Sequence, residues 1–114
     1  MDSEVRALGR QYARQTRRRM ARAIRDLLTI QRVGSGDTSR VSAWIREQGE
    51  ASRVAGFARV ARLCQSMEDC LAGLRNGERP AVVPVVGTLL EVCRTVQLHA
   101  ESVVRALPQE RISA

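Results

Sequence analysis

Residues 36–77, GDTSRVSAWIREQGEASRVAGFARVARLCQSMEDCLAGLRNG, contain two amphipathic segments that meet at Gly56. In each segment, apolar or small residues recur in steps of three and four, which is the period of an α-helix. They are Val41, Trp44, Ile45, Gln48, Ser52 and Ala55 in the first segment, and Phe57, Val60, Leu63, Cys64, Met67, Leu71 and Leu74 in the second. The pattern predicts helices over residues 38–55 and 57–75, although the polar Gln48 weakens the first stripe.

Turn residues bound this helical pair on both sides. Gly36 belongs to a turn, and Asp37 or Thr38 can cap the helix that follows. Gly56 marks a break or a close helix crossing. The Asn-Gly pair at residues 76–77 is a signal for a left-handed C-cap. The two helices are therefore expected to form a hairpin with defined ends.

A longer amphipathic segment flanks the hairpin on each side, over residues 4–31 and 82–107. The stripe of the first contains Val5, Leu8, Tyr12, Met20, Ile24, Leu27 and Leu28, and that of the second contains Val86, Leu89, Cys93, Val96, Ala100, Val103 and Leu107. The first stripe thins where Ala13 and Thr16 stand. Short connections between four helices predict an all-α, up-down-up-down four-helix bundle, with residues 1–114 as a single domain.

The stretch from Ala81 to Val86 is rich in β-branched residues, which leaves a strand as an alternative there. Pro84 argues against a central strand because proline cannot donate a ladder hydrogen bond. A proline is tolerated in the first turn of a helix, where its missing N–H would have had no partner. We therefore expect Pro80 and Pro84 to introduce the fourth helix.

The positive charge is concentrated near the N-terminus. All 19 basic side chains are arginines, set against 12 acidic ones, and the formal net charge is +7. Residues 1–32 hold nine arginines and three acids, a balance of +6, and the remaining chain has a balance of +1. A basic face is expected on the first helix, since these arginines stand largely off its apolar stripe: Arg10, Arg14, Arg17, Arg18, Arg22 and Arg25. Such a face suits phosphates, anionic lipid or an acidic protein.

Several classes of function are disfavoured by the composition. A lone histidine and three scattered cysteines do not supply the four clustered ligands of a zinc site, and no phosphate-cradling glycine loop is present. The acids are dispersed, so we expect no enzyme and no cofactor. No apolar run is long enough to span a bilayer, and residues 1–10 lack an apolar signal core. Cys64, Cys70 and Cys93 are expected to be reduced thiols in a cytoplasmic protein.

The hairpin sequence resembles the central helix pair of histidine phosphotransfer (HPt) domains, including the phosphotransfer domains of chemotaxis-type kinases. The features that match are the Gly36-Asp37 turn, the Gly56-Phe57 pair, the residues around Leu63 and Cys64, and Glu68. The family is a four- or five-helix bundle whose second helix exposes a phospho-accepting histidine, followed three residues later by a lysine and then by a glycine. The resemblance covers about a third of the chain well, and the number and order of the helices extend it to the rest.

This chain lacks the histidine that the resemblance implies. Aligning Gly56 and Phe57 with the family's pair puts Arg46 at the histidine, Gly49 at the lysine and Glu50 at the glycine. A register shifted by one residue puts Gly49 on that glycine and Ile45 at the histidine. The single histidine, His99, lies in the fourth predicted helix, where we expect it to flank the apolar stripe. A guanidinium cannot replace an imidazole as the phosphate acceptor.

A helical wheel places the substituted position on the surface. Arg46 lies about 160° from the centre of the stripe on its helix, so it faces solvent. Gly49, Glu50 and Arg53 lie near it and complete a predicted partner-binding surface. We therefore expect an HPt-like adaptor that binds the receiver domain of a response regulator without transferring phosphate.

Two alternatives from other classes remain at this point. The first is a basic bundle that binds nucleic acid through the first helix. The second is a bundle that self-associates, since Leu98 lies opposite the stripe of its helix and would be exposed in a monomer. No membrane partner is expected, because the bulky apolar residues of the first helix are needed for the core.

Overall fold

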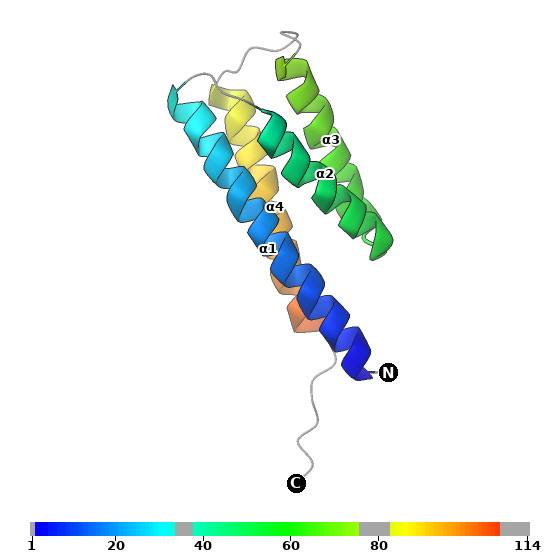
Figure 1. The fold of residues 1–114 in the computed structure, drawn as a ribbon. Helices are drawn as coiled ribbons and strands as arrows, with labels where there is room; N and C mark the ends of the chain where they lie inside the picture. The colour runs from blue at the N-terminus through cyan, green and yellow to red at the C-terminus, as the bar shows by residue number, and fades with distance from the viewer. Residues whose placement is uncertain (1, 34–37, 76–82, 108–114) are drawn as a thin grey trace.

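The computed structural model describes residues 2–33, 38–75 and 83–107 (Figure 1). These ranges contain four α-helices and no strand: α1 (Asp2–Val33), α2 (Ser39–Val54), α3 (Ala58–Arg75) and α4 (Val83–Ala106). The predicted all-helical class is confirmed, and the predicted helix bounds agree within two residues at every end. Pro84 stands in the first turn of α4, as expected, and no strand forms over residues 83–86.

The helices are arranged as two antiparallel pairs (Figure 1). α1 and α4 lie side by side and share the most extensive contact, and α2 and α3 form a shorter hairpin whose α2 packs on α1. The molecule is elongated, with principal extents of 60 × 23 × 18 Å. Because the hairpin is shorter than the α1–α4 pair, the N-terminal turns of α1 extend beyond it.

A continuous apolar core runs between the helices. Each fully buried aliphatic side chain contributes about 1.5–3 kcal/mol through removal from water. Every helix supplies part of this core, whose largest members include Met20, Leu27, Ile45, Leu71, Val86 and Val96. The stripes predicted for residues 57–75 and 82–107 supply most of the core residues of α3 and α4.

Five residues that the stripes predicted to be buried are exposed instead, among them Ala55, the C-cap residue of α2. Val5 and Leu8 lie near the N-terminal end of α1, and Leu8 is 67% exposed beside the open groove between α1 and α2. Leu28 is turned about 100° from the buried Leu27 and falls on the outer side of α1. Leu63 is exposed because α3 and α4 touch little and a largely apolar groove of about 350 Å³ separates them.

Gly56 ends α2 in a left-handed conformation, with a φ of 88°. The Phe57 N–H donates to the Ser52 carbonyl at 2.8 Å and the Gly56 N–H donates to the Arg53 carbonyl at 3.1 Å. These two bonds form a Schellman motif, in which glycine is favoured because it adopts positive φ without steric cost. The break predicted at Gly56 is therefore confirmed.

The predicted start of α2 is only partly as expected. Thr38 precedes the helix but its side chain makes no capping hydrogen bond, so a Thr38 cap is wrong. Its backbone adopts the helical region, with φ −83° and ψ −6°, which brings the Thr38 carbonyl within 2.9 Å of the Ser42 N–H. The predicted turn residues Gly36 and Asp37 and the Asn-Gly pair at 76–77 lie outside the described residues.

Gly49 was predicted to be an exposed small residue of a docking surface, and this placement is wrong. It is half-buried where α2 crosses α3, and a Cβ atom built on it would lie 3.1 Å from the Cβ of Cys64. Glycine therefore allows the two helix backbones to approach closely. A side chain at this position would make a tight contact with Cys64 at the crossing.

Substitution of this glycine should destabilise the hairpin. Gly49→Val forces its added methyl groups against α3, and we expect a loss of about 1–3 kcal/mol from overpacking. Gly87→Val is the matched control, because a Cβ at Gly87 of α4 meets no other atom within 4 Å. Urea unfolding should show a lower midpoint for Gly49→Val than for Gly87→Val, and equal midpoints would contradict the crossing described here.

Candidate functional site

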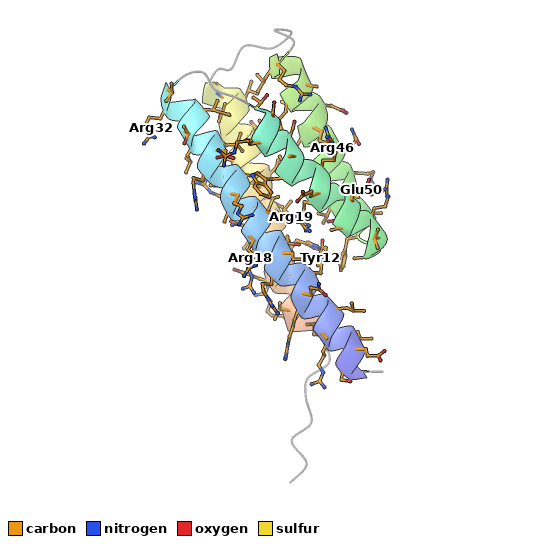
Figure 2. All side chains as sticks on the ribbon, in the orientation of Figure 1. Tyr12, Arg18, Arg19, Arg32, Arg46 and Glu50 are labelled. Carbon is orange, nitrogen blue, oxygen red and sulfur yellow. The ribbon has the colours of Figure 1, made fainter. Side chains whose placement is uncertain are left out.

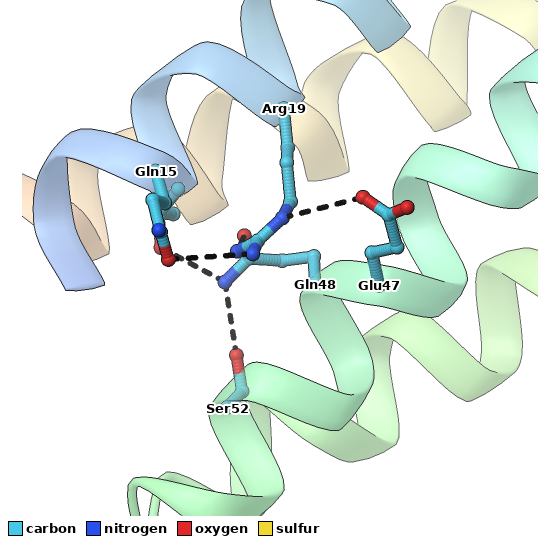
Figure 3. Close-up of polar contacts among 6 residues, drawn as sticks. Gln15, Arg19, Glu47, Gln48 and Ser52 are labelled. Atoms are coloured by element: carbon cyan, nitrogen blue, oxygen red, sulfur yellow. Dashed lines mark hydrogen bonds and ion pairs between the residues drawn. The ribbon is translucent and has the colours of Figure 1, made fainter. Parts of the chain in front are cut away.

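A buried layer of polar side chains joins α1 to α2, with Gln48 at its centre. The Gln48 side chain is fully buried, and its Nε2 donates to Thr16 Oγ1 at 2.9 Å and to Ser52 Oγ at 3.0 Å. Its Oε1 accepts a hydrogen bond from Arg19 Nη1 at 3.2 Å (Figure 3). Gln48 and Thr16, which weakened the predicted stripes, are therefore partners across the helix interface.

Tyr12 extends this layer to α4. Its hydroxyl lies 2.8 Å from Ser52 Oγ and 2.8 Å from His99 Nε2. A phenol has one proton, so one consistent arrangement has Gln48 donating to Ser52, Ser52 to Tyr12, and Tyr12 to the free lone pair of His99 Nε2. The rings of Phe57 and His99 pack edge-to-face beside Tyr12, with centroids 4.7 Å apart. One hydrogen-bonded chain thus links α2, α1 and α4.

Burial favours the neutral forms of Tyr12 and His99 in this layer. Desolvation raises the pKa of Tyr12 above its usual value, and it lowers the pKa of His99 below its usual value. His99 is half-buried and flanks the apolar stripe of α4, as predicted. Its Nε2 is engaged with Tyr12, so the arrangement is suited to holding three helices in register rather than to proton transfer from that nitrogen.

A groove with a volume of about 740 Å³ opens above this layer, between α1 and α2. Tyr12 lines it together with the exposed apolar side chains of Leu8 and Val54, the latter 84% exposed. Charged residues of α1 and α2 also line the groove: Arg19, Arg46, Glu47 and Glu50. The groove therefore combines an apolar surface with charges of both signs.

Arg19 connects the buried layer to the surface of the groove. Its Nε lies 3.7 Å from Glu47 Oε2, while its Nη2 donates to Gln15 Oε1 at 3.5 Å (Figure 3). With the bond to Gln48, every nitrogen of this guanidinium has a partner, and the side chain is only 17% exposed. Sequence reasoning missed Arg19 because it stands among exposed arginines, and only its partners on α2 distinguish it.

The structure separates the four predicted docking residues into different roles. Arg46 is exposed and its Nε donates to Glu68 Oε1 of α3 at 2.9 Å. Glu50 is exposed and pairs with Arg53 along α2. Arg46 and Glu50 line the groove, Arg53 is exposed outside it, and Gly49 faces α3. The predicted surface therefore reduces to Arg46 and Glu50 beside the groove.

The basic face predicted on α1 is exposed at all six positions, namely Arg10, Arg14, Arg17, Arg18, Arg22 and Arg25. One of them has a partner, since the guanidinium of Arg22 lies 4.8 Å from the centre of the Trp44 ring. A cation above an indole face is attracted by the ring quadrupole. Arg22 is thereby tied to α2, while the other five make no such contact with the residues that the structure describes.

The three cysteines are free thiols, and two of them are buried. Burial raises the pKa of Cys64 to about 11 and that of Cys93 to about 12, so both stay protonated at neutral pH. No group of three or more histidine, cysteine or acidic residues that could hold a metal ion occurs in ranges 2–33, 38–75 and 83–107. In the same ranges no helix is long and apolar enough to cross a membrane.

Comparisons with known proteins do not assign a family. No family model matches the chain, and neither the curated proteins nor the solved structures contain a match to it.

The Leu98 side chain of α4 is 61% exposed, as predicted. Self-association through this residue stays a prediction.

The lowered pKa of His99 predicts how the stability of the fold depends on pH. Because the folded protein holds His99 with a lowered pKa, the unfolded chain binds a proton at a higher pH, near about 6.5. Stability should therefore fall as the pH drops below about 6.5. His99→Gln retains an acceptor for the Tyr12 hydroxyl but does not titrate, so its thermal midpoint should fall less between pH 7.5 and 5. Parallel falls in both proteins would contradict this assignment.

Proposed function

We propose that this protein is a non-catalytic, HPt-like adaptor that binds the receiver domain of a response regulator without accepting or transferring phosphate. The up-down bundle of the HPt type is part of this proposal. One observation carries it. Two residues that the resemblance identified separately, Arg46 in place of the histidine and the matching Glu68, lie in contact across α2 and α3, with Nε and Oε1 2.9 Å apart.

The surroundings of Arg46 support a docking role. The side chain is 65% exposed at the edge of the α1–α2 groove. Its Nε is occupied by Glu68, which orients the guanidinium and leaves its two Nη groups for another acceptor. The resemblance implies that a receiver presents an acidic phosphorylation pocket to this helix. A guanidinium suits carboxylates or an aspartyl phosphate, because its fork donates two parallel hydrogen bonds.

The chemistry of Arg46 and the position of His99 argue against phosphate acceptance by this protein. The guanidinium of Arg46 stays protonated, and it offers no lone pair to attack a phosphoryl group. His99 lies on α4 with its Nε2 hydrogen-bonded to Tyr12 at 2.8 Å. Binding would therefore sequester a receiver or report its state.

Binding to receiver domains from the source organism, with and without acetyl phosphate, tests the proposal. Arg46→Glu should weaken binding at least tenfold, because it places a carboxylate against both Glu68 and the acidic pocket of the receiver. Arg105→Glu, at an exposed position of α4, is the charge-matched control and should bind the receiver as the wild type does. Titration calorimetry would measure both, and circular dichroism would verify folding.

Absence of binding to every receiver would contradict the adaptor function, as would equal weakening by the two variants. Arg46→Ala removes the cation without placing a second carboxylate beside Glu68, so it separates docking from disturbance of the hairpin. Radiolabelled phosphate should remain on the receiver throughout, and label on this chain would contradict the non-catalytic assignment.

A further inference from the structure

The outer side of α1 carries a row of exposed arginines, here called the arginine ladder: Arg10, Arg14, Arg17, Arg18, Arg25 and Arg32. At 3.6 residues per turn, all six lie within an arc of about 100°, opposite the buried stripe of the helix. From Arg10 to Arg32 the row is about 33 Å long, at 1.5 Å per residue. Figure 2 shows Arg18 and Arg32 on the side of α1 that faces away from α2 and α3.

The ladder gathers six uncompensated arginines on one face of a single helix, whereas the unpaired arginines of α3 and α4, such as Arg59 and Arg94, are divided between two helices. Within ranges 2–33, 38–75 and 83–107, none of its six members forms an ion pair or a hydrogen bond. By contrast, Arg40 lies 3.8 Å from Asp26, while Arg46 and Arg53 each pair with a glutamate. Most of the excess positive charge of the chain is thus aligned on one straight, accessible surface.

We propose that the arginine ladder binds the phosphate backbone of a nucleic-acid duplex without preference for base sequence. The planar fork of a guanidinium donates paired hydrogen bonds to phosphate oxygens. Like charges held in a row on a rigid helix attract a polyanion and gain from the release of its counterions. The high density of negative charge along a duplex is therefore the feature that the ladder recognises. Contacts to phosphates position a protein on a duplex without reading its bases.

The location of the aromatic residues favours a duplex over a single strand. Single-strand binders stack exposed bases on aromatic side chains. Tyr12 is buried, and Trp44 and Phe57 are half-buried against the core. None of the three lies on the ladder side of α1, so the ladder provides phosphate contacts but no stacking surface.

The apolar residues of α1 favour nucleic acid over a membrane. An amphipathic helix binds a bilayer by inserting bulky apolar side chains beside its basic residues. Between Arg10 and Arg25 the apolar stripe of α1 is occupied by the core, and no large apolar side chain of this stretch is exposed. Beyond Arg25, at the C-terminal end of the ladder, Leu28 is 43% exposed and Val33 is 63% exposed.

This inference is independent of the proposed receiver binding. Arg46 lies on α2 beside the α1–α2 groove, whereas the ladder occupies the opposite side of α1 (Figure 2). Loss of duplex binding through ladder variants should therefore leave receiver binding unchanged, and Arg46→Glu should leave duplex binding unchanged.

Fluorescence anisotropy with a labelled 20-base-pair DNA duplex of arbitrary sequence, over a series of salt concentrations, tests the ladder. With about five phosphate contacts, the logarithm of the binding constant should fall against the logarithm of salt with a slope of about −4 to −5. The triple variant Arg14→Gln, Arg18→Gln, Arg25→Gln should reduce the steepness of that slope by about 3 and weaken binding at low salt. A scrambled duplex of the same length should bind equally well.

The matched control is the triple variant Arg59→Gln, Arg62→Gln, Arg94→Gln, which removes the same charge from exposed positions of α3 and α4. It should retain the wild-type slope. An equal loss of duplex affinity in the two triple variants would show that only net charge matters and would overturn the proposal for the ladder. The proposal would also be overturned by absence of duplex binding at low salt, by tighter binding to a single strand, or by ladder-dependent binding confined to phosphatidylglycerol vesicles.

Discussion

The hydrogen-bonded layer around Gln48 constrains the rest of this structure. A buried side-chain amide without partners costs about 1–3 kcal/mol, so α2 must pack where Gln48 meets Thr16 and Ser52. A shift of one helical turn, about 5.4 Å, would remove Gln48 from Thr16. Apolar residues alone tolerate such a shift more readily, because their contacts have no fixed direction. The layer therefore sets the register of the hairpin against α1, and through Tyr12 and His99 it joins the same register to α4.

This register determines which surfaces the molecule presents. Arg46 precedes Gln48 by two residues, so the layer that holds Gln48 inward also holds Arg46 outward, at the edge of the groove and within reach of Glu68. The charges of α2 are largely satisfied by neighbouring helices. The arginines on the outer side of α1 are not, because α2 and α4 pack on the other side of that helix. The two proposed binding surfaces thus follow from one packing arrangement and lie on different sides of α1.

Sequence periodicity was sufficient to predict the four helices, because the 3.6-residue period directly reflects burial on one face. It also predicted the break at Gly56, whose positive φ few other residues adopt, and the exposure of the basic face. It did not predict the polar layer, since a pattern within one helix treats Gln48 and Thr16 as defects, and their pairing exists only between helices. Gly49 was misplaced because a glycine has no side chain to indicate its direction. Leu8 was misplaced because periodicity does not show that α1 and α2 leave an open groove beside it.

The central claim is that the contact between Thr16 and Gln48 fixes the α1–α2 register. A double-mutant cycle on this pair, with Thr16→Val, Gln48→Met and both together, tests it most directly. Each substitution nearly preserves volume and removes one partner. Urea unfolding should give a coupling free energy of at least about 0.5 kcal/mol, with the double variant less destabilised than the sum of the single ones, because neither partner is then left unpaired. Additive effects, with a coupling near zero, would contradict the claim.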